Sequence, residues 1–211
     1  IVYKLLKTIP LQIPILIGDA LHNLRSAIDL LACQLAKRQN TLGRKEIKCE
    51  GTEFPIRKDA DSFLKSLDSG KIKILGKDAI EEIKELKPYR GGNDRLWQLH
   101  KLNIIDKHRL LVVANIANTE GVLETKAGGF SMKVDMAQAG LGGPSIVKDG
   151  TVLISKSGNP EMNFDLTFYI VFDEAGVLSM EKVETGLLQM RDAVVIALEK
   201  LSPFIEENKS N

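Results

Sequence analysis

Apolar residues recur every three or four positions in a long stretch near the start of the chain. Pro14 suits the first turn of a helix, where the N–H that proline lacks has no partner. The apolar positions that follow are Ile17, Leu21, Leu24, Ile28, Leu31 and Leu35. This spacing predicts a long amphipathic helix that ends between Lys37 and Asn40. A similar stripe after Ser179 predicts a second long helix, and we expect the two helices to pack side by side.

Shorter helices are predicted between these two. One covers Asp59–Leu67, and another begins at Lys77 or Asp78 and ends at Leu86, before a proline. A third, middle helix follows the turn PYRGGND, where Asn93 or Asp94 can cap its N-terminus. Apolar residues fall on all sides of this middle helix, which indicates burial by its neighbours.

After Arg109 the apolar pattern changes to a period of two. Residues 130–136 and 164–172 alternate apolar and polar side chains, which is typical of strands with one face on a core. The dipeptide Asp149-Gly150 predicts a hairpin. Connections too short for crossover helices predict an antiparallel sheet. We therefore expect an antiparallel sheet of about four or five strands from residues 110–173.

These patterns predict an α+β fold. Its helical core consists of the long N-terminal and C-terminal helices and the buried middle helix, within residues 11–109 and 179–207. The sheet part covers residues 110–173. A chain of 211 residues fits one large domain or two small ones, and we expect a single α+β domain over residues 1–211.

Composition is that of an ordinary globular chain, with 44% hydrophobic residues. No run approaches the roughly 18 apolar residues of a membrane span, and we expect no membrane association. Nothing indicates export, and Cys33 and Cys49 make no disulfide framework or zinc spacing. A cytoplasmic protein without a metal or cofactor is therefore expected.

Charge is distributed unevenly, although the net charge is only +1. Residues 1–109 hold 21 Lys and Arg against 14 Asp and Glu, a balance of +7, whereas residues 110–211 hold 8 against 14, a balance of −6. The basic half could attract RNA. Two halves of opposite charge could also simply lie side by side in one fold, and we prefer this second interpretation.

The polar face of the first helix carries short hydrogen-bonding side chains in place of the usual Lys and Glu. His22, Arg25 and Asp29 form one ridge at positions i, i+3 and i+7. Such side chains indicate partners at close range. They form either a buried network that only orders the helices or a functional pocket.

The other two histidines, His100 and His108, lie on the middle helix or at its end. Clustered histidines favour acid–base chemistry or anion binding, because histidine changes charge near neutral pH. We predict that the first ridge faces the side of the middle helix that carries His100, Asn103 and Asp106. The predicted ligand-binding residues are His22, Arg25, Asp29, Asn103, Asp106, His108 and Arg109. The cations after Asp106 could instead only complement the C-terminus of the helix.

Four stretches carry a likeness to a known family: IGDALHNLRSAIDLLA, FPI, LKPYRGG and LWQLHKLNIIDKHRLL. Together they resemble a bacterial protein family without an assigned function, and the likeness covers about residues 15–112. The resemblance implies no particular activity.

The segment RLWQLH, from Arg95 to His100, has a weaker likeness to HEPN-type helical domains. These domains include metal-independent endoribonucleases, and their mark is an Arg and a His four to six residues apart. The resemblance implies that Arg95 steadies the phosphate and that His100 moves a proton during attack by the RNA 2′-hydroxyl. Leu96 departs from the polar residue that is common after this Arg.

Two classes of function follow. The first is a non-catalytic binding or structural module, with a small anionic ligand at the Arg and His cluster. The second is an HEPN-like endoribonuclease in which Arg95 and His100 are catalytic and the basic half draws in RNA. Such enzymes usually share their cleft across a dimer, so a homodimer is one option for the assembly. The buried character of the middle helix favours the module.

Overall fold

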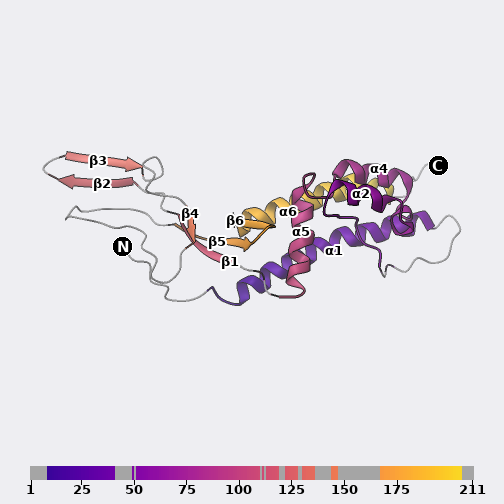
Figure 1. The fold of residues 1–211 in the computed structure, drawn as a ribbon, viewed down its shortest axis with the longest axis horizontal. Helices are drawn as coiled ribbons and strands as arrows, with labels where there is room; N and C mark the ends of the chain where they lie inside the picture. Colours follow the sequence, from indigo (N-terminus) through magenta and orange to yellow (C-terminus); the bar gives the residue numbers. More distant parts are fainter. Residues whose placement is uncertain are drawn as a thin grey trace. The chain divides into compact units, whose positions relative to one another are not determined.

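The structure, a computed structural model, describes residues 9–40, 49, 51–109, 111, 113–118, 122–127, 130–135, 144–146 and 167–205. Over these residues the fold is α+β with antiparallel strand pairing, as predicted (Figure 1). The chain divides into two compact units, one formed by residues 15–110 and 184–211 and the other by residues 1–14 and 111–183. A single domain over the whole chain stays a prediction.

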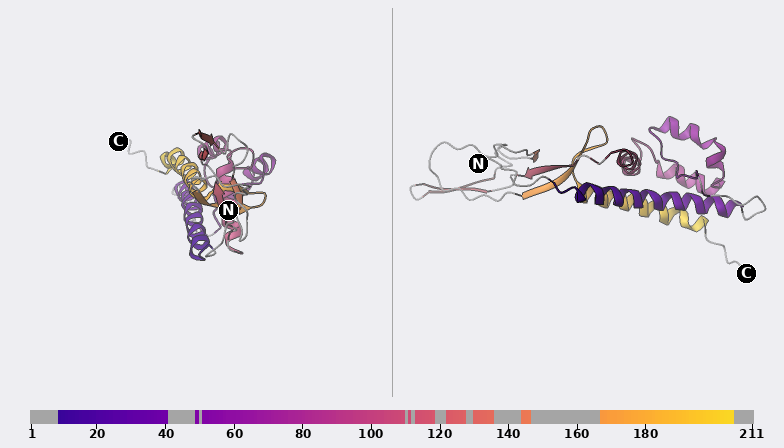
Figure 2. Two further views of the ribbon diagram at one scale, coloured as in Figure 1. Left: turned by 90° about the vertical axis from the view of Figure 1, so that its left-hand side faces the viewer. Right: turned by 90° about the horizontal axis from the view of Figure 1, so that it is seen from below.

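Helices make up most of the first unit. Their bounds are α1 Gln12–Asn40, α2 Ala60–Leu67, α3 Gly70–Lys73, α4 Lys77–Leu86, α5 Asp94–Asp106 and α6 Val183–Leu201, followed by a 3-10 turn at Ser202–Phe204. Figures 1 and 2 show α1 and α6 running side by side. The hydrophobic pattern did not predict the short helix α3.

The predicted apolar stripe of α1 forms a large part of the core. Five of its six residues are at most 5% exposed: Ile17, Leu21, Ile28, Leu31 and Leu35. Met190, Val194 and Leu201 of the predicted α6 stripe are also buried. Full burial of each such side chain stabilises the fold by about 1.5–3 kcal/mol, so the two stripes contribute a large part of the apolar core of this unit.

The middle helix α5 begins where the sequence suggested. The side chain of Asn93 accepts a hydrogen bond from the Leu96 N–H (3.2 Å), which caps the helix. Leu96, Trp97, Leu99, Leu102 and Asn103 are all buried. These residues lie on several sides of the helix, but Ile104 is 36% exposed, so the predicted burial of all its sides holds only in part.

The second unit contains the strands. They are β1 Val113–Asn118, β2 Val122–Ala127, β3 Phe130–Asp135, β4 Pro144–Ile146, β5 Thr167–Glu174 and β6 Leu178–Lys182. An antiparallel four-stranded sheet has the order β4-β1-β5-β6, and β2 pairs with β3 in a separate antiparallel two-stranded sheet.

The prediction of one sheet with four or five strands from residues 110–173 is therefore wrong. The strands of that range divide between two sheets, and β6 lies beyond it. Ser179, predicted to cap the last helix, lies in β6 instead, because a turn with Gly176 at φ +77° folds β6 back on β5. The hairpin predicted at Asp149-Gly150 lies outside the described residues.

Cys33 of α1 and Cys49 are joined by a disulfide bond, with their Cα atoms 5.3 Å apart. The expectation that the two cysteines make no disulfide framework is thus contradicted. The spacing of two cysteines in a sequence does not reveal whether the later segment lies against the helix that carries the first one. Here Cys33 is 2% exposed, and its partner is half-buried.

Figure 1 shows α5 passing close to α1, and the carboxylate of Asp106, the last residue of α5, lies against Gly18 of α1. A Cβ atom added at Gly18 would overlap the carboxylate of Asp106, so one of the two residues would have to shift. Glycine at this position therefore allows the backbone of α1 and the last residue of α5 to approach closely.

We predict that Gly18→Ala destabilises the protein by about 1–2 kcal/mol, because the overlap costs more than the helix propensity gained from alanine. In an Asp106→Ala background the same change should be neutral or stabilising. Urea unfolding of the four proteins measures the coupling. Equal effects of Gly18→Ala in both backgrounds would contradict this account of the contact between Gly18 and Asp106.

Candidate functional site

Polar side chains on the ridge of α1 form hydrogen bonds with the backbone of Phe54. Arg25 Nη2 donates to the Phe54 carbonyl oxygen (3.0 Å) and lies 2.7 Å from Asp29 Oδ1. The same Oδ1 accepts the Phe54 N–H (2.8 Å). Arg25 and Asp29 are one helical turn apart, which places both side chains on one face of α1. We call this arrangement of Arg25, Asp29 and the Phe54 backbone the Phe54 clamp.

Burial dominates the electrostatics of the Phe54 clamp. It lowers the pKa of Arg25, which is 4% exposed, and the neighbouring Asp29 carboxylate opposes that effect. Burial likewise raises the pKa of Asp29, while Arg25 and the Phe54 N–H oppose the rise. Desolvation therefore works against both charges, and removal of Asp29 would leave the buried Arg25 guanidinium without its carboxylate partner.

We predict that Asp29→Ala destabilises the protein by about 3 kcal/mol, the usual cost of breaking a buried pair. Asp192→Ala is a matched control, because Arg191 and Asp192 also lie 2.7 Å apart but are 55% and 58% exposed. The control should cost less than about 0.5 kcal/mol. Chemical unfolding of both variants provides the measurement, and similar losses from the two would refute a special role for the clamp.

Four cations act on the charge of His100 on α5. Burial lowers the pKa of His100 to about 4, and the positive charges of Arg25, Lys101, Arg57 and Lys107 act in the same direction. His100 is therefore neutral at pH 7, within a region of positive potential. We call His100 and these four cations the inner cluster.

The stability of the protein should depend on the protonation of His100. Between pH 6.5 and about 4 the unfolded chain binds a proton at this residue and the folded protein does not, so this contribution to stability falls as the pH falls. The full shift would correspond to roughly 3 kcal/mol, and solvent around the half-buried ring reduces the expected loss to roughly 1–2 kcal/mol.

Unfolding free energies of the wild type and of His100→Gln, measured from pH 4 to pH 7, test this expectation. The difference between the two proteins should change with pH over this window. His108→Gln, at an exposed histidine, serves as the control. If the difference in unfolding free energy between the wild type and His100→Gln stays constant from pH 4 to pH 7, the lowered pKa of His100 is contradicted.

A second group of polar residues lies nearer the start of α1. Burial raises the pKa of Asp106, the negative charge of Asp19 raises it further, and His22 opposes the rise. We call Asp19, His22 and Asp106 the outer cluster. The close approach of Gly18 and Asp106 shows that the end of α5 lies against α1. Charged groups of α1 act on the pKa of both His100 and Asp106. That the whole ridge of His22, Arg25 and Asp29 faces His100, Asn103 and Asp106 stays a prediction.

The other predicted ligand-binding residues are dispersed. Asn103 is buried at 4% exposure, and its carbonyl oxygen accepts the Lys107 N–H at the end of α5. His108 and Arg109 are exposed and follow the end of the helix. Within the described ranges, no group of three or more His, Cys, Asp or Glu side chains could hold a metal ion.

Contacts join the four stretches that carry the family resemblance. The Phe54 clamp links the first stretch to the second. Arg57, directly after the second, donates its N–H to the Pro88 carbonyl of the third (3.0 Å). The guanidinium of Arg90 lies 5.0 Å from the centre of the Trp97 ring, which links the third to the fourth. The contact at Gly18 links the fourth to the first. The four stretches therefore form one continuous structure.

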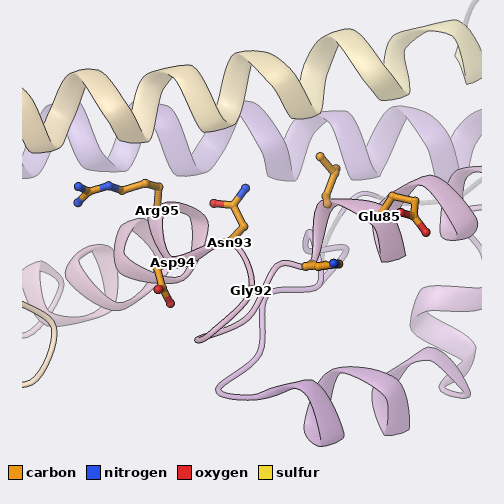
Figure 3. Close-up of a pocket in the computed structure, with 7 residues that line it drawn as sticks. Glu85, Gly92, Asn93, Asp94 and Arg95 are labelled. Carbon is orange, nitrogen blue, oxygen red and sulfur yellow. The ribbon is translucent and has the colours of Figure 1, made fainter.

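Arg95 lines a pocket of about 450 Å³ at the start of α5 (Figure 3). Its Nη1 donates to Gln98 Oε1 (2.9 Å). The lining residues are Glu85, Leu86, Lys87, Gly92, Asn93, Asp94 and Arg95. His100 is absent from this lining, and five positions of about 100° each put the two side chains about 140° apart around the helix.

Sequence reasoning missed several members of the site. Arg57 and Lys101 were not among the predicted residues, and Lys107 was considered only for the C-terminus of the middle helix. The role of Phe54 rests on its backbone, which leaves no side-chain signal. The short FPI stretch was the available hint, because apolar residues beside prolines in a polar loop indicate a buried segment.

Comparison of the chain with protein-family models, curated proteins and solved structures finds no match. Both family resemblances therefore stay expectations from the sequence. None of the helices in the described part of the chain has the length and apolar character that crossing a bilayer requires.

Proposed function

We propose that the helical unit is a non-catalytic binding module in which the inner cluster holds a small anion. The observation that carries the proposal is the buried Nη1 atom of Arg25, which has no hydrogen-bond acceptor among the described residues. A buried donor without an acceptor costs about 1–3 kcal/mol. An anion that reached this atom would remove that cost.

The charges around Arg25 support the same ligand class. Arg57, Lys101 and Lys107 bring positive potential to His100, whose pKa of about 4 leaves its neutral ring able to donate or accept a hydrogen bond. Arg57 is half-buried, and its Nη1 donates to the Ile56 carbonyl (2.9 Å), which restrains the guanidinium. Restrained arginines suit oxyanions, because their N–H groups match two oxygens at once.

We expect inorganic phosphate to raise the melting temperature more than potassium chloride of equal ionic strength. At a phosphate concentration about 100-fold above Kd, the folded protein would gain roughly 2.7 kcal/mol. Arg57→Gln should weaken phosphate binding about tenfold or more, as expected for the loss of a charged hydrogen bond. Arg191→Gln, at an exposed arginine, should bind like the wild type. Calorimetric titration with phosphate measures the Kd of all three proteins.

Equal effects of phosphate and chloride on the wild type would contradict the proposal. So would equal phosphate affinities of the wild type and Arg57→Gln. The chloride control is necessary because simple screening of the basic half also changes stability.

An HEPN-like ribonuclease remains the second candidate and stays a prediction. Its catalytic pair would be Arg95 and His100, and the angular separation of the two on α5 argues against joint action within one copy of the chain. Cleavage of an RNA oligonucleotide by the wild type, lost in His100→Ala, would favour this alternative. A homodimer and cytoplasmic location also stay predictions.

A further inference from the structure

The disulfide between Cys33 and Cys49 lies close to the Phe54 clamp. Cys33 follows Asp29 by one turn of α1, and Cys49 precedes Phe54 by five residues. The separation of 5.3 Å between the two Cα atoms is in the range that disulfides require. Cys49 and Phe54 are therefore both attached to α1, Cys49 covalently and Phe54 through the clamp.

Arg57 belongs to the next part of the same segment. Its N–H donates to the Pro88 carbonyl, and its charge acts on His100. The carbonyl of Phe54 also holds Arg25, so a shift of this segment would change two members of the inner cluster together. The covalent attachment at Cys49 restricts such shifts.

We propose that the redox state of the Cys33–Cys49 pair controls the anion affinity of the inner cluster, a regulation that rests on the function proposed above. The oxidised pair keeps the segment with Phe54 and Arg57 in its binding position. Reduction releases one attachment and lowers the fraction of molecules that are competent to bind. Apparent affinity falls in proportion to that fraction.

Glutathione disulfide is an oxidant that can form the Cys33–Cys49 bond by thiol–disulfide exchange. The thiolate of Cys49, the more exposed of the two, attacks one sulfur of the oxidant and releases a glutathione thiolate. The thiolate of Cys33 then attacks the sulfur of Cys49 in the mixed disulfide and releases the second glutathione. Two protein thiols are oxidised by two electrons and lose two protons, while one glutathione disulfide is reduced to two glutathione thiols.

The test uses the full chain, equilibrated with either glutathione disulfide or reduced glutathione and then freed of both. Alkylation followed by mass spectrometry counts the free thiols in each form. Calorimetric titration with inorganic phosphate should give an affinity at least about threefold higher for the oxidised form, which corresponds to a competent fraction of about one third after reduction. Cys49→Ser should bind like the reduced wild type after either treatment.

The outcomes separate the two proposals. Free thiols that persist after treatment with glutathione disulfide would overturn the redox inference. Equal phosphate affinities of the oxidised and reduced wild type would also overturn it, and would leave the anion site intact. Absence of phosphate binding in both forms would overturn the proposed function together with this inference. The comparison of the two wild-type forms holds even if Cys49→Ser fails to fold.

Discussion

One buried guanidinium joins segments of the helical unit that are distant in sequence. Arg25 is nearly inaccessible to water, so its charge must find acceptors within the protein. Asp29 and the Phe54 carbonyl provide them, and Asp29 also accepts the Phe54 N–H. Both backbone polar groups of Phe54 are thus satisfied by a single turn of α1. Apolar packing of Phe54 and Ile56 becomes possible because their backbone needs no water.

The polar face of α1 is divided between two environments of different charge. In its early part, Asp19 and His22 act on the charge of Asp106, whose pKa is raised. In its later part, Arg25 acts with three other cations on His100, whose pKa is lowered. Asp106 and His100 both belong to α5, so one pair of helices raises the pKa of a carboxylate in one region and lowers the pKa of a histidine in another.

Periodicity predicted the helices well because burial of α1 follows its apolar stripe almost residue by residue. The same criterion failed at residues 178–182. Their sequence, LSMEK, resembles the start of a helix, but these residues form a strand because they pair with β5. Tertiary context commonly overrides such weak local preference.

The candidate site was predictable in part. Arg25, Asp29 and His100 stood out because their chemistry was unusual for their helices. Arg57 and the Phe54 backbone did not, since their roles depend on which loop lies against α1, and a sequence read alone contains no signal for that contact.

The turn between α4 and α5 closes on itself. Lys87 adopts a left-handed conformation with φ of 47°, and its carbonyl oxygen accepts the N–H groups of both Tyr89 and Asn93 at 2.7 Å. Gly92 packs so closely against Lys87 that no side chain fits there. An insertion or deletion of one residue here would move Pro88 away from Arg57 and, at the same time, Arg90 away from its aromatic partner. A homologous chain would therefore have to keep the length of this turn more strictly than the identity of most of its side chains.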